Sequence, residues 1–212
     1  MMKEENNKEE VRRIIIDTAL KEFKEKGIKD VKMDDIAARL SMSKRTIYEL
    51  FNDKAEILYE SMKIQNQKMQ EKGRAIIRSA SDVLDTILKL YDLYLTSLKS
   101  INKKFFTEIK KYPDVCKHNK NHEAQYDKQF LAWMELGRKQ GLFREDANFE
   151  IFSFMLHKNL ETIFVANIGE DNHSLAKYPP EELGRMLFIF YLRGISTSKG
   201  QQIIEDYLRE NK

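Results

Sequence analysis

The apolar positions near the start of the chain recur every three or four residues, which is the spacing of one face of an α-helix. They are Val11, Ile14, Ile15, Ala19 and Phe23. Gly27 follows this pattern and fits the left-handed backbone position just past a helix end. The pattern therefore predicts a first helix over residues 9–26.

Three further helical pieces follow the first helix. The second has its apolar positions at Met33, Ile36, Ala37 and Leu40. Ser43 is a good N-cap for a third helix over residues 44–51. Asp53 and Glu56 have capping-box spacing, with Asp in the cap role, and predict the start of a fourth and longer helix.

Two short helices joined by a tight connection form a helix-turn-helix, whose second helix presents its N-terminal side chains to the DNA major groove. Here these side chains are Lys44, Arg45 and Thr46, and Tyr48 shares their outer face. Cationic and hydroxyl groups on one exposed face suit phosphate oxygens and base edges. The spacing alone leaves an alternative open, because a Lys-Arg pair at the start of a short capped helix is usually solvated surface.

A resemblance to a known family favours the DNA-binding alternative. Residues 14–58 read IIIDTALKEFKEKGIKDVKMDDIAARLSMSKRTIYELFNDKAEIL. In the order and spacing of its key residues, this segment resembles the DNA-binding head of the TetR family of bacterial repressors. The matching features are Ala19 and Phe23, Gly27, Met33-Asp34-Asp35-Ile36-Ala37, Ser43-Lys44, Ile47-Tyr48, Phe51 and Lys54.

The resemblance implies that residues 1–54 form a helix-turn-helix DNA-binding domain and residues 55–212 a helical dimerisation and effector-binding domain. It assigns one set of side chains to bases or nearby phosphates, namely Lys44, Arg45 and Thr46. It assigns a second set to the DNA backbone, namely Ser43, Tyr48 and Lys54. Double-stranded operator DNA is the partner that this assignment implies.

Two positions depart from the family pattern. Ser41 stands where the family usually has a turn glycine, so we expect a mildly strained backbone there. Lys32 stands where the family often has Ser or Thr, so we expect the second helix to lack a side-chain cap from this residue.

Composition favours an all-α fold, and the helix-turn-helix pattern with the family resemblance implies a three-helix head followed by a larger helical body. The 212 residues include only 8 Gly and 3 Pro, too few for the many turns of a strand-rich fold. The net charge is +3, yet residues 1–54 carry 13 Lys and Arg against 12 Asp and Glu. A case for DNA binding must therefore rest on where the charges lie rather than on their total.

Other features of the composition bear on location. The N-terminus lacks the apolar stretch of a secretion signal, and no apolar run approaches the roughly 20 residues that span a bilayer. The single cysteine, Cys116, excludes an internal disulfide framework and suits a reducing compartment. We expect a cytoplasmic protein that does not contact a membrane.

The periodicity after residue 70 predicts a helical body. Helices are expected over residues 82–100, 105–111, 122–140 and 149–167, from Pro179 onward, and over 201–208. Asn148 is a suitable cap for one of them, and Pro180 is tolerated in the first turn of another.

Two of these helices, over residues 149–167 and from Pro179 onward, are apolar nearly all round. A helix that is apolar on all sides must be covered on all sides, and a second copy of the chain is the simplest cover. We therefore predict a homodimer with a four-helix interface; the alternative is a central helix pair in a monomer. The predicted interface residues are Phe154, Leu183, Phe188, Leu192, Gly194 and Ile195.

Aromatic residues on the other body helices are candidates for an effector pocket, as the family resemblance implies. The chosen residues combine apolar bulk with a polar or polarizable group, or extend the aromatic stripe. They are Tyr91, Tyr94, Phe106, Trp133, Met134 and His157. An apolar or aromatic small molecule would suit them, although an aromatic stripe at helical spacing is more often plain core.

Two polar clusters are weaker candidates for sites. His118 and His122 have a spacing that can bind a metal, but their surroundings are lysine-rich, and we expect a solvated segment and neither a metal nor a cofactor. The lysines over residues 103–117 are expected to form a solvated face; alternatively, they lie near the DNA-binding head and couple the two domains.

Taken together, these features predict a dimeric repressor that binds an inverted-repeat operator and is released by a small molecule. The alternative is a TetR-like protein whose body binds a protein partner. An enzyme is not expected, because the sequence has no Gly-rich phosphate loop, metal-binding Cys/His set or nucleophile elbow.

Overall fold

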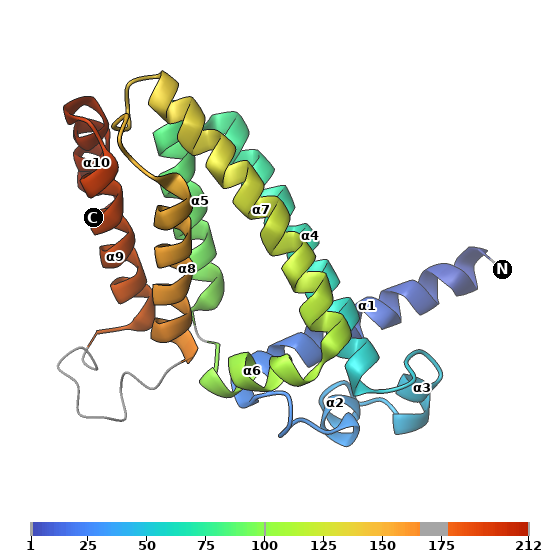
Figure 1. Cartoon of the computed structure of the whole chain (residues 1–212). Coiled ribbons are helices and arrows are strands. Elements are labelled where there is room, and N and C mark those ends of the chain that lie inside the picture. The colour runs from blue at the N-terminus through green and yellow to red at the C-terminus, as the bar shows by residue number, and fades with distance from the viewer. Residues whose placement is uncertain (1, 100, 166–177, 212) are drawn as a thin grey trace. The chain divides into compact units, whose positions relative to one another are not determined.

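The computed structural model is built from helices, as the composition predicts, and it describes residues 2–99, 101–165 and 178–211. Figure 1 shows the arrangement. In chain order the elements are α1 (Met2–Lys26), α2 (Met33–Arg39), α3 (Lys44–Tyr48), α4 (Lys54–Ser79), α5 (Val83–Leu98), α6 (Lys103–Glu108), the 3-10 turn η1 (Ile109–Lys111), α7 (Pro113–Lys139), α8 (Phe149–Val165), α9 (Pro180–Ile195) and α10 (Ser198–Glu210).

The chain forms two compact units. Unit 1 consists of Met1–Met69 and Ser100–His122, and unit 2 consists of Gln70–Lys99 and Glu123–Lys212. The long helices α4 and α7 each contribute to both units. Residues 100–122 therefore pack with the N-terminal helices, although residues 70–99 separate them from the rest of unit 1 in the sequence.

The core of unit 1 includes buried apolar residues of α1 that the helical spacing predicts. Ile15, Ala19 and Phe23 are fully buried among residues from α2, α3 and α4. Gly27 ends α1 with a positive φ of 93°, and its amide donates to the carbonyl oxygen of Phe23 at 2.9 Å. A Cβ on Gly27 would lie only 2.9 Å from the Cβ of Lys104. Glycine is therefore required both for the turn and for the close approach of α6.

The connection between α2 and α3 is a Schellman turn with Ser41 in the left-handed position. The amide of Met42 donates to the carbonyl of Ala37 at 2.9 Å, and that of Ser41 to Ala38 at 3.1 Å. The φ of Ser41 is 52°, which confirms the expected backbone strain at this position.

Both short helices of the pair have identifiable caps. The side chain of Lys32 does not cap α2, as expected; instead the carboxylate of Asp35 accepts the amide of Lys32 at 2.8 Å. Ser43 caps α3, because its hydroxyl accepts the amide of Thr46 at 3.1 Å. This confirms the predicted start of α3, but the helix ends at Tyr48 rather than at residue 51.

Unit 2 is built around a close contact between α5 and α9. The Tyr91 ring stacks on Phe188 with a centroid distance of 3.7 Å, and the Tyr91 hydroxyl donates to the carbonyl of Gly184 at 3.1 Å. A Cβ on Gly184 would come within 2.9 Å of the Leu95 side chain. The absence of a side chain at this position lets the two helices meet.

Several helices of the body begin at other residues than the sequence predicts. The helix expected from residue 122 begins at Pro113, because proline suits a first helical turn as well as it ends a preceding helix. The last helix begins at Ser198 and is capped by Thr197. Asn148 caps α8 as predicted, with its side chain accepting the amide of Ile151 at 2.9 Å. The predicted helix ends at residues 100 and 167 lie outside the described residues.

Replacing Ser41 by glycine is expected to raise the free energy of unfolding by about 0.5–1 kcal/mol, because glycine adopts a positive φ without steric cost. Urea unfolding of the two proteins would measure this difference. Ser41→Ala is the matched control and should give no increase, since alanine keeps the Cβ that causes the strain. A stabilisation by alanine equal to that by glycine would contradict the explanation.

Candidate nucleic-acid interface

The outer face of α3 is open to solvent. The side chain of Arg45 is 88% exposed, that of Lys44 49%, and Tyr48 is 48% exposed. Tyr48 shares a face with Lys44 and Arg45 because it follows them by four and three positions. Ser43 and Thr46 flank this face, and their hydroxyl oxygens lie 2.8 Å from each other. The structure thus brings together five of the six residues predicted to contact DNA.

The two cations of α3 are held by carboxylates at the surface. Lys44 forms an ion pair with Asp34 of α2 at 3.0 Å, and Arg45 pairs with Glu49 at 3.0 Å. The hydrogen bond from Lys44 to Asp34 and the negative charge of this carboxylate raise the pKa of Lys44. Exposed ion pairs of this kind contribute little free energy, so a phosphate or a base edge can replace the carboxylate at small cost.

Lys54, the sixth predicted residue, points into unit 1. Its ammonium donates to the carbonyl oxygens of Ile28 at 2.6 Å and Val31 at 2.7 Å. Partial burial lowers the pKa of this lysine. In the structure, Lys54 fixes the connection between α1 and α2; its contact with the DNA backbone stays a prediction.

The inner face of α3 is held by buried apolar residues and by one arginine. Ile47 and Phe51 are buried in the core of unit 1. The guanidinium of Arg12 in α1 donates to the carbonyl of Leu50 at 2.6 Å, pairs with Glu56 of α4 at 3.3 Å, and lies 4.2 Å from the centroid of the Phe51 ring. Arg12 therefore ties together α1, the end of α3 and the start of α4.

The role of Arg12 was not predicted, although the sequence carries a signal for it. Arg12 precedes the buried residues Ile15 and Ile16 by three and four positions, which places it on the core-facing side of α1. A charged residue on an apolar helix face requires a partner, because burying an unpaired charge is costly. Glu22 gives the same signal: it is 2% exposed and pairs with Lys26 and Arg39.

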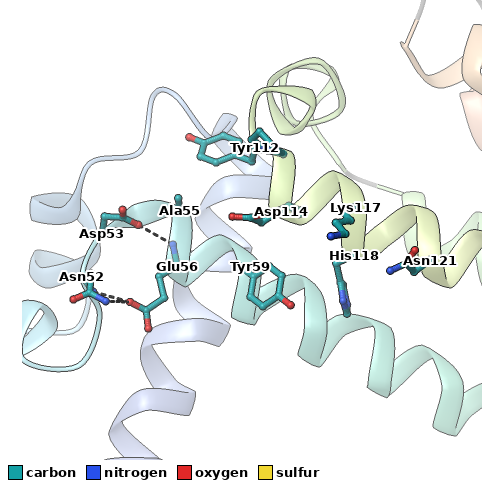
Figure 2. Close-up of a pocket in the computed structure, with 12 residues that line it drawn as sticks. Asn52, Asp53, Ala55, Glu56, Tyr59, Tyr112, Asp114, Lys117, His118 and Asn121 are labelled. Carbon is teal, nitrogen blue, oxygen red and sulfur yellow. Dashed lines mark hydrogen bonds between the residues drawn. The ribbon is translucent and has the colours of Figure 1, made fainter.

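A groove of about 630 Å³ lies in unit 1 between the first turns of α4 and the residues around the start of α7, as Figure 2 shows. Tyr59 meets the His118 ring edge-on at a centroid distance of 5.5 Å. Burial and the neighbouring His122 lower the pKa of His118, which keeps this imidazole neutral at pH 7. Two carboxylates of the groove serve the fold: Asp53 accepts the amide of Glu56, and Glu56 accepts the amide of Asn52, each at 2.8 Å.

The six residues predicted to line an effector pocket divide between the two units. Phe106 packs against the core of unit 1, whereas the other five belong to unit 2. Of those, Tyr91 and Met134 are buried, Trp133 is partly buried, and Tyr94 and His157 are exposed.

A second cavity lies in unit 2, and none of the predicted pocket residues lines it. Its volume is about 310 Å³, and it lies between the end of α5 and the start of α9. The lining residues are Leu95, Thr96, Lys99, Pro179, Glu181, Glu182 and Arg185.

The residues predicted for the dimer interface also divide into two groups. Leu183, Phe188 and Leu192 form the inner face of α9 and are buried in unit 2. Phe154 of α8 is 60% exposed, Gly194 is exposed, and Ile195 is half-buried. Further large apolar residues of the two helices are exposed, namely Ile151, Met155, Met186 and Phe190.

Within the described residues, no helix is long and apolar enough to cross a membrane.

Comparisons with known proteins agree with this geometry. Residues 15–60 match the family model for bacterial regulatory proteins of the tetR family. A protein from Saccharomonospora viridis, described as a transcriptional regulator in complex with choline, superposes with a TM-score of 0.75 at 21% identity and covers 89% of this chain and 99% of its own. A TetR family regulator from Agrobacterium tumefaciens has a TM-score of 0.71 at 12% sequence identity, and the match covers 90% of this chain and 100% of that protein. The TetR family regulator PfmR from Thermus thermophilus has a TM-score of 0.59 at 21% sequence identity, and the match covers 84% of this chain and 97% of PfmR.

No curated relative matches the chain. The matched residues cover the helix-turn-helix, in which α3 is exposed and supported by the neighbouring helices. Residues 15–60 therefore form a helix-turn-helix of the tetR-family type, and the chain has a fold similar to those of solved TetR family regulators.

Replacing Arg12 by methionine should lower the free energy of unfolding by about 2 kcal/mol, because it removes a charge-assisted hydrogen bond to the Leu50 carbonyl and the partner of Glu56. Thermal or urea unfolding would measure the change. Arg13→Met is the matched control, since Arg13 is exposed on the same helix turn. Equal stability of the two variants would show that Arg12 does not anchor α3.

Proposed function

We propose that this protein is a homodimeric repressor that binds an inverted-repeat operator through α3 and releases it when a small molecule binds the body. Residues 1–54 hold the DNA and residues 55–212 dimerise and bind the effector, with residues 100–122 packed on the DNA-binding side. The exposed face of Lys44, Arg45 and Tyr48 on a rigidly supported α3 is the observation that carries this proposal.

We assign the side chains on and beside α3 to two kinds of DNA contact, with base edges and with phosphates. The guanidinium of Arg45 is the most exposed of them, and its planar set of donors suits the O6 and N7 acceptors of guanine. Lys44, Ser43 and Tyr48 offer an ammonium and hydroxyls to phosphate oxygens, which fix the register of the protein on the duplex.

The exposed apolar residues of α8 and α9 support the dimer. Phe154 and Phe190 are 60% and 59% exposed, and Ile151, Met155 and Met186 extend the same apolar surface. Gly194 has open space where a Cβ would stand, so a second chain can approach closely there. A two-fold dimer presents two copies of α3 to half-sites about one helical turn apart, which doubles the phosphate contacts.

The effector is proposed to bind among the aromatic residues of unit 2. Tyr91, Tyr94, Trp133, Met134 and His157 offer apolar surface together with hydroxyl, indole and imidazole groups. The choline complex of a protein with this fold supports a small-molecule site, and aromatic rings bind quaternary ammonium ions through cation–π contacts. A ligand that prefers another body conformation would reduce DNA affinity by roughly 5- to 150-fold, a coupling of about 1–3 kcal/mol.

Selection of bound sequences from a random DNA pool would test the proposal, followed by gel shifts on the selected sequence. We expect an inverted repeat, salt-sensitive retention, and release by one member of a panel that includes choline and neutral aromatic compounds. Retention without a symmetric sequence would contradict the operator. Release by no compound, together with a stoichiometric protein partner, would favour the protein-binding alternative.

Replacing Arg45 by alanine should weaken binding to the selected operator by about 10- to 100-fold and relax the base preference at one position of each half-site. Titration of labelled operator and a point-substituted duplex would measure both effects. Arg78→Ala removes one exposed arginine from the other unit and should leave the affinity unchanged. If both variants bind alike, Arg45 does not read a base.

Replacing Phe154 or Phe190 by glutamate should raise the dimer dissociation constant by about 100-fold or more, because a carboxylate would be buried in an apolar interface. Sedimentation equilibrium would measure the association. Leu136→Glu is the control, since Leu136 is 45% exposed on α7, outside the proposed interface of α8 and α9. A wild-type protein that sediments as a monomer at all concentrations would exclude this interface.

A further inference from the structure

The positive charge of unit 1 comes mainly from outside the helix-turn-helix. Residues 1–69 carry 15 Lys and Arg against 14 Asp and Glu, a net charge of only +1. Residues 100–122 carry six lysines against two acids, Glu108 and Asp114, which raises unit 1 to +5. Because the whole chain is +3, unit 2 is negative at −2. We call residues 101–122 the lysine segment.

The lysine segment is fixed to the DNA-binding helices by buried side chains and hydrogen bonds. Phe105 and Val115 are 3% and 1% exposed in the core of unit 1. The amide of Asn102 donates to the carbonyl of Lys24 at 2.7 Å, at the end of α1. The amide of Lys29 donates to the carboxylate of Glu108 at 2.7 Å. The lysines are therefore carried on a fixed part of unit 1.

Most lysines of the segment face solvent within the unit that contains the helix-turn-helix. Lys103, Lys110 and Lys111 are exposed to solvent. Lys104 reaches the α1–α2 connection and pairs with Asp30 at 2.7 Å. Figure 1 shows α6 beside α1 within unit 1, which also contains α2 and α3.

We propose that Lys103, Lys110 and Lys111 bind DNA phosphates flanking the base pairs that α3 reads. The inference rests on the proposed operator binding and adds a second, sequence-independent contact surface to it. Ammonium groups on an otherwise nearly neutral unit displace counterions from the duplex, and this release supplies affinity in proportion to the number of phosphates neutralised. DNA is the polyanion favoured here because these lysines and α3 belong to the same unit.

The test compares two variants of the full-length protein that each lose three positive charges. Lys103→Gln, Lys110→Gln and Lys111→Gln are combined in one variant. The matched control combines Lys72→Gln, Lys128→Gln and Lys139→Gln, three exposed lysines of unit 2. The probes are the selected operator and a random duplex of the same length, titrated from about 50 to 200 mM salt. Thermal unfolding of both variants confirms that they are folded.

The first variant is expected to bind both duplexes about tenfold more weakly than the control. Its slope of log affinity against log salt should be shallower by about 1 or more for each protomer. Replacing the same three residues by arginine should restore the wild-type slope. Equal affinities and slopes for the two glutamine variants would overturn the inference, while operator binding by the wild type would leave the proposed function standing. Absence of any salt-sensitive binding by the wild type would instead overturn the proposed function itself.

Discussion

The proposed DNA recognition depends on holding a very short helix in one orientation. α3 has five residues, and a helix of that length is not stable by itself because nucleation is costly. Its inner side is fixed by the burial of Ile47 and Phe51, and its end by the Arg12 guanidinium on the Leu50 carbonyl. Because these anchors come from α1 and the core of unit 1, the pose of the exposed residues follows from tertiary packing.

The connection before α2 is fixed from two sides in the same way. Lys54 of α4 donates to its carbonyl oxygens, and Glu108 of α6 accepts one of its amides. α6 therefore packs as part of unit 1, which contains the helix-turn-helix, although it follows α5 in the sequence. α4 and α7 each contribute residues to both units.

In unit 2, the apolar helices α8 and α9 have both buried and exposed apolar residues. The inner face of α9 packs within the unit, where Phe188 stacks on Tyr91 and the Tyr91 hydroxyl is bonded to Gly184. The outer side of α8 and α9 keeps Phe154 and Phe190 exposed. An effector that bound at Tyr91, as proposed, would have to replace this ring contact and this hydrogen bond, and would thereby shift α5 against α9.

The sequence alone determined the local features of this protein. Periodic apolar positions predicted the helices, and Ser43 and Asn148 predicted two helix starts, because each of these depends on neighbours within a few residues. The strained backbone at Ser41 was expected from the resemblance to the TetR family pattern. The sequence also placed Lys44, Arg45 and Tyr48 on one exposed face. Only the tertiary structure decided which distant segments meet. The packing of residues 100–122 with the N-terminal helices, the anchoring by Arg12, the inward turn of Lys54 and the division of α9 into buried and exposed faces all depend on contacts between segments far apart in the chain, which a periodic pattern does not encode.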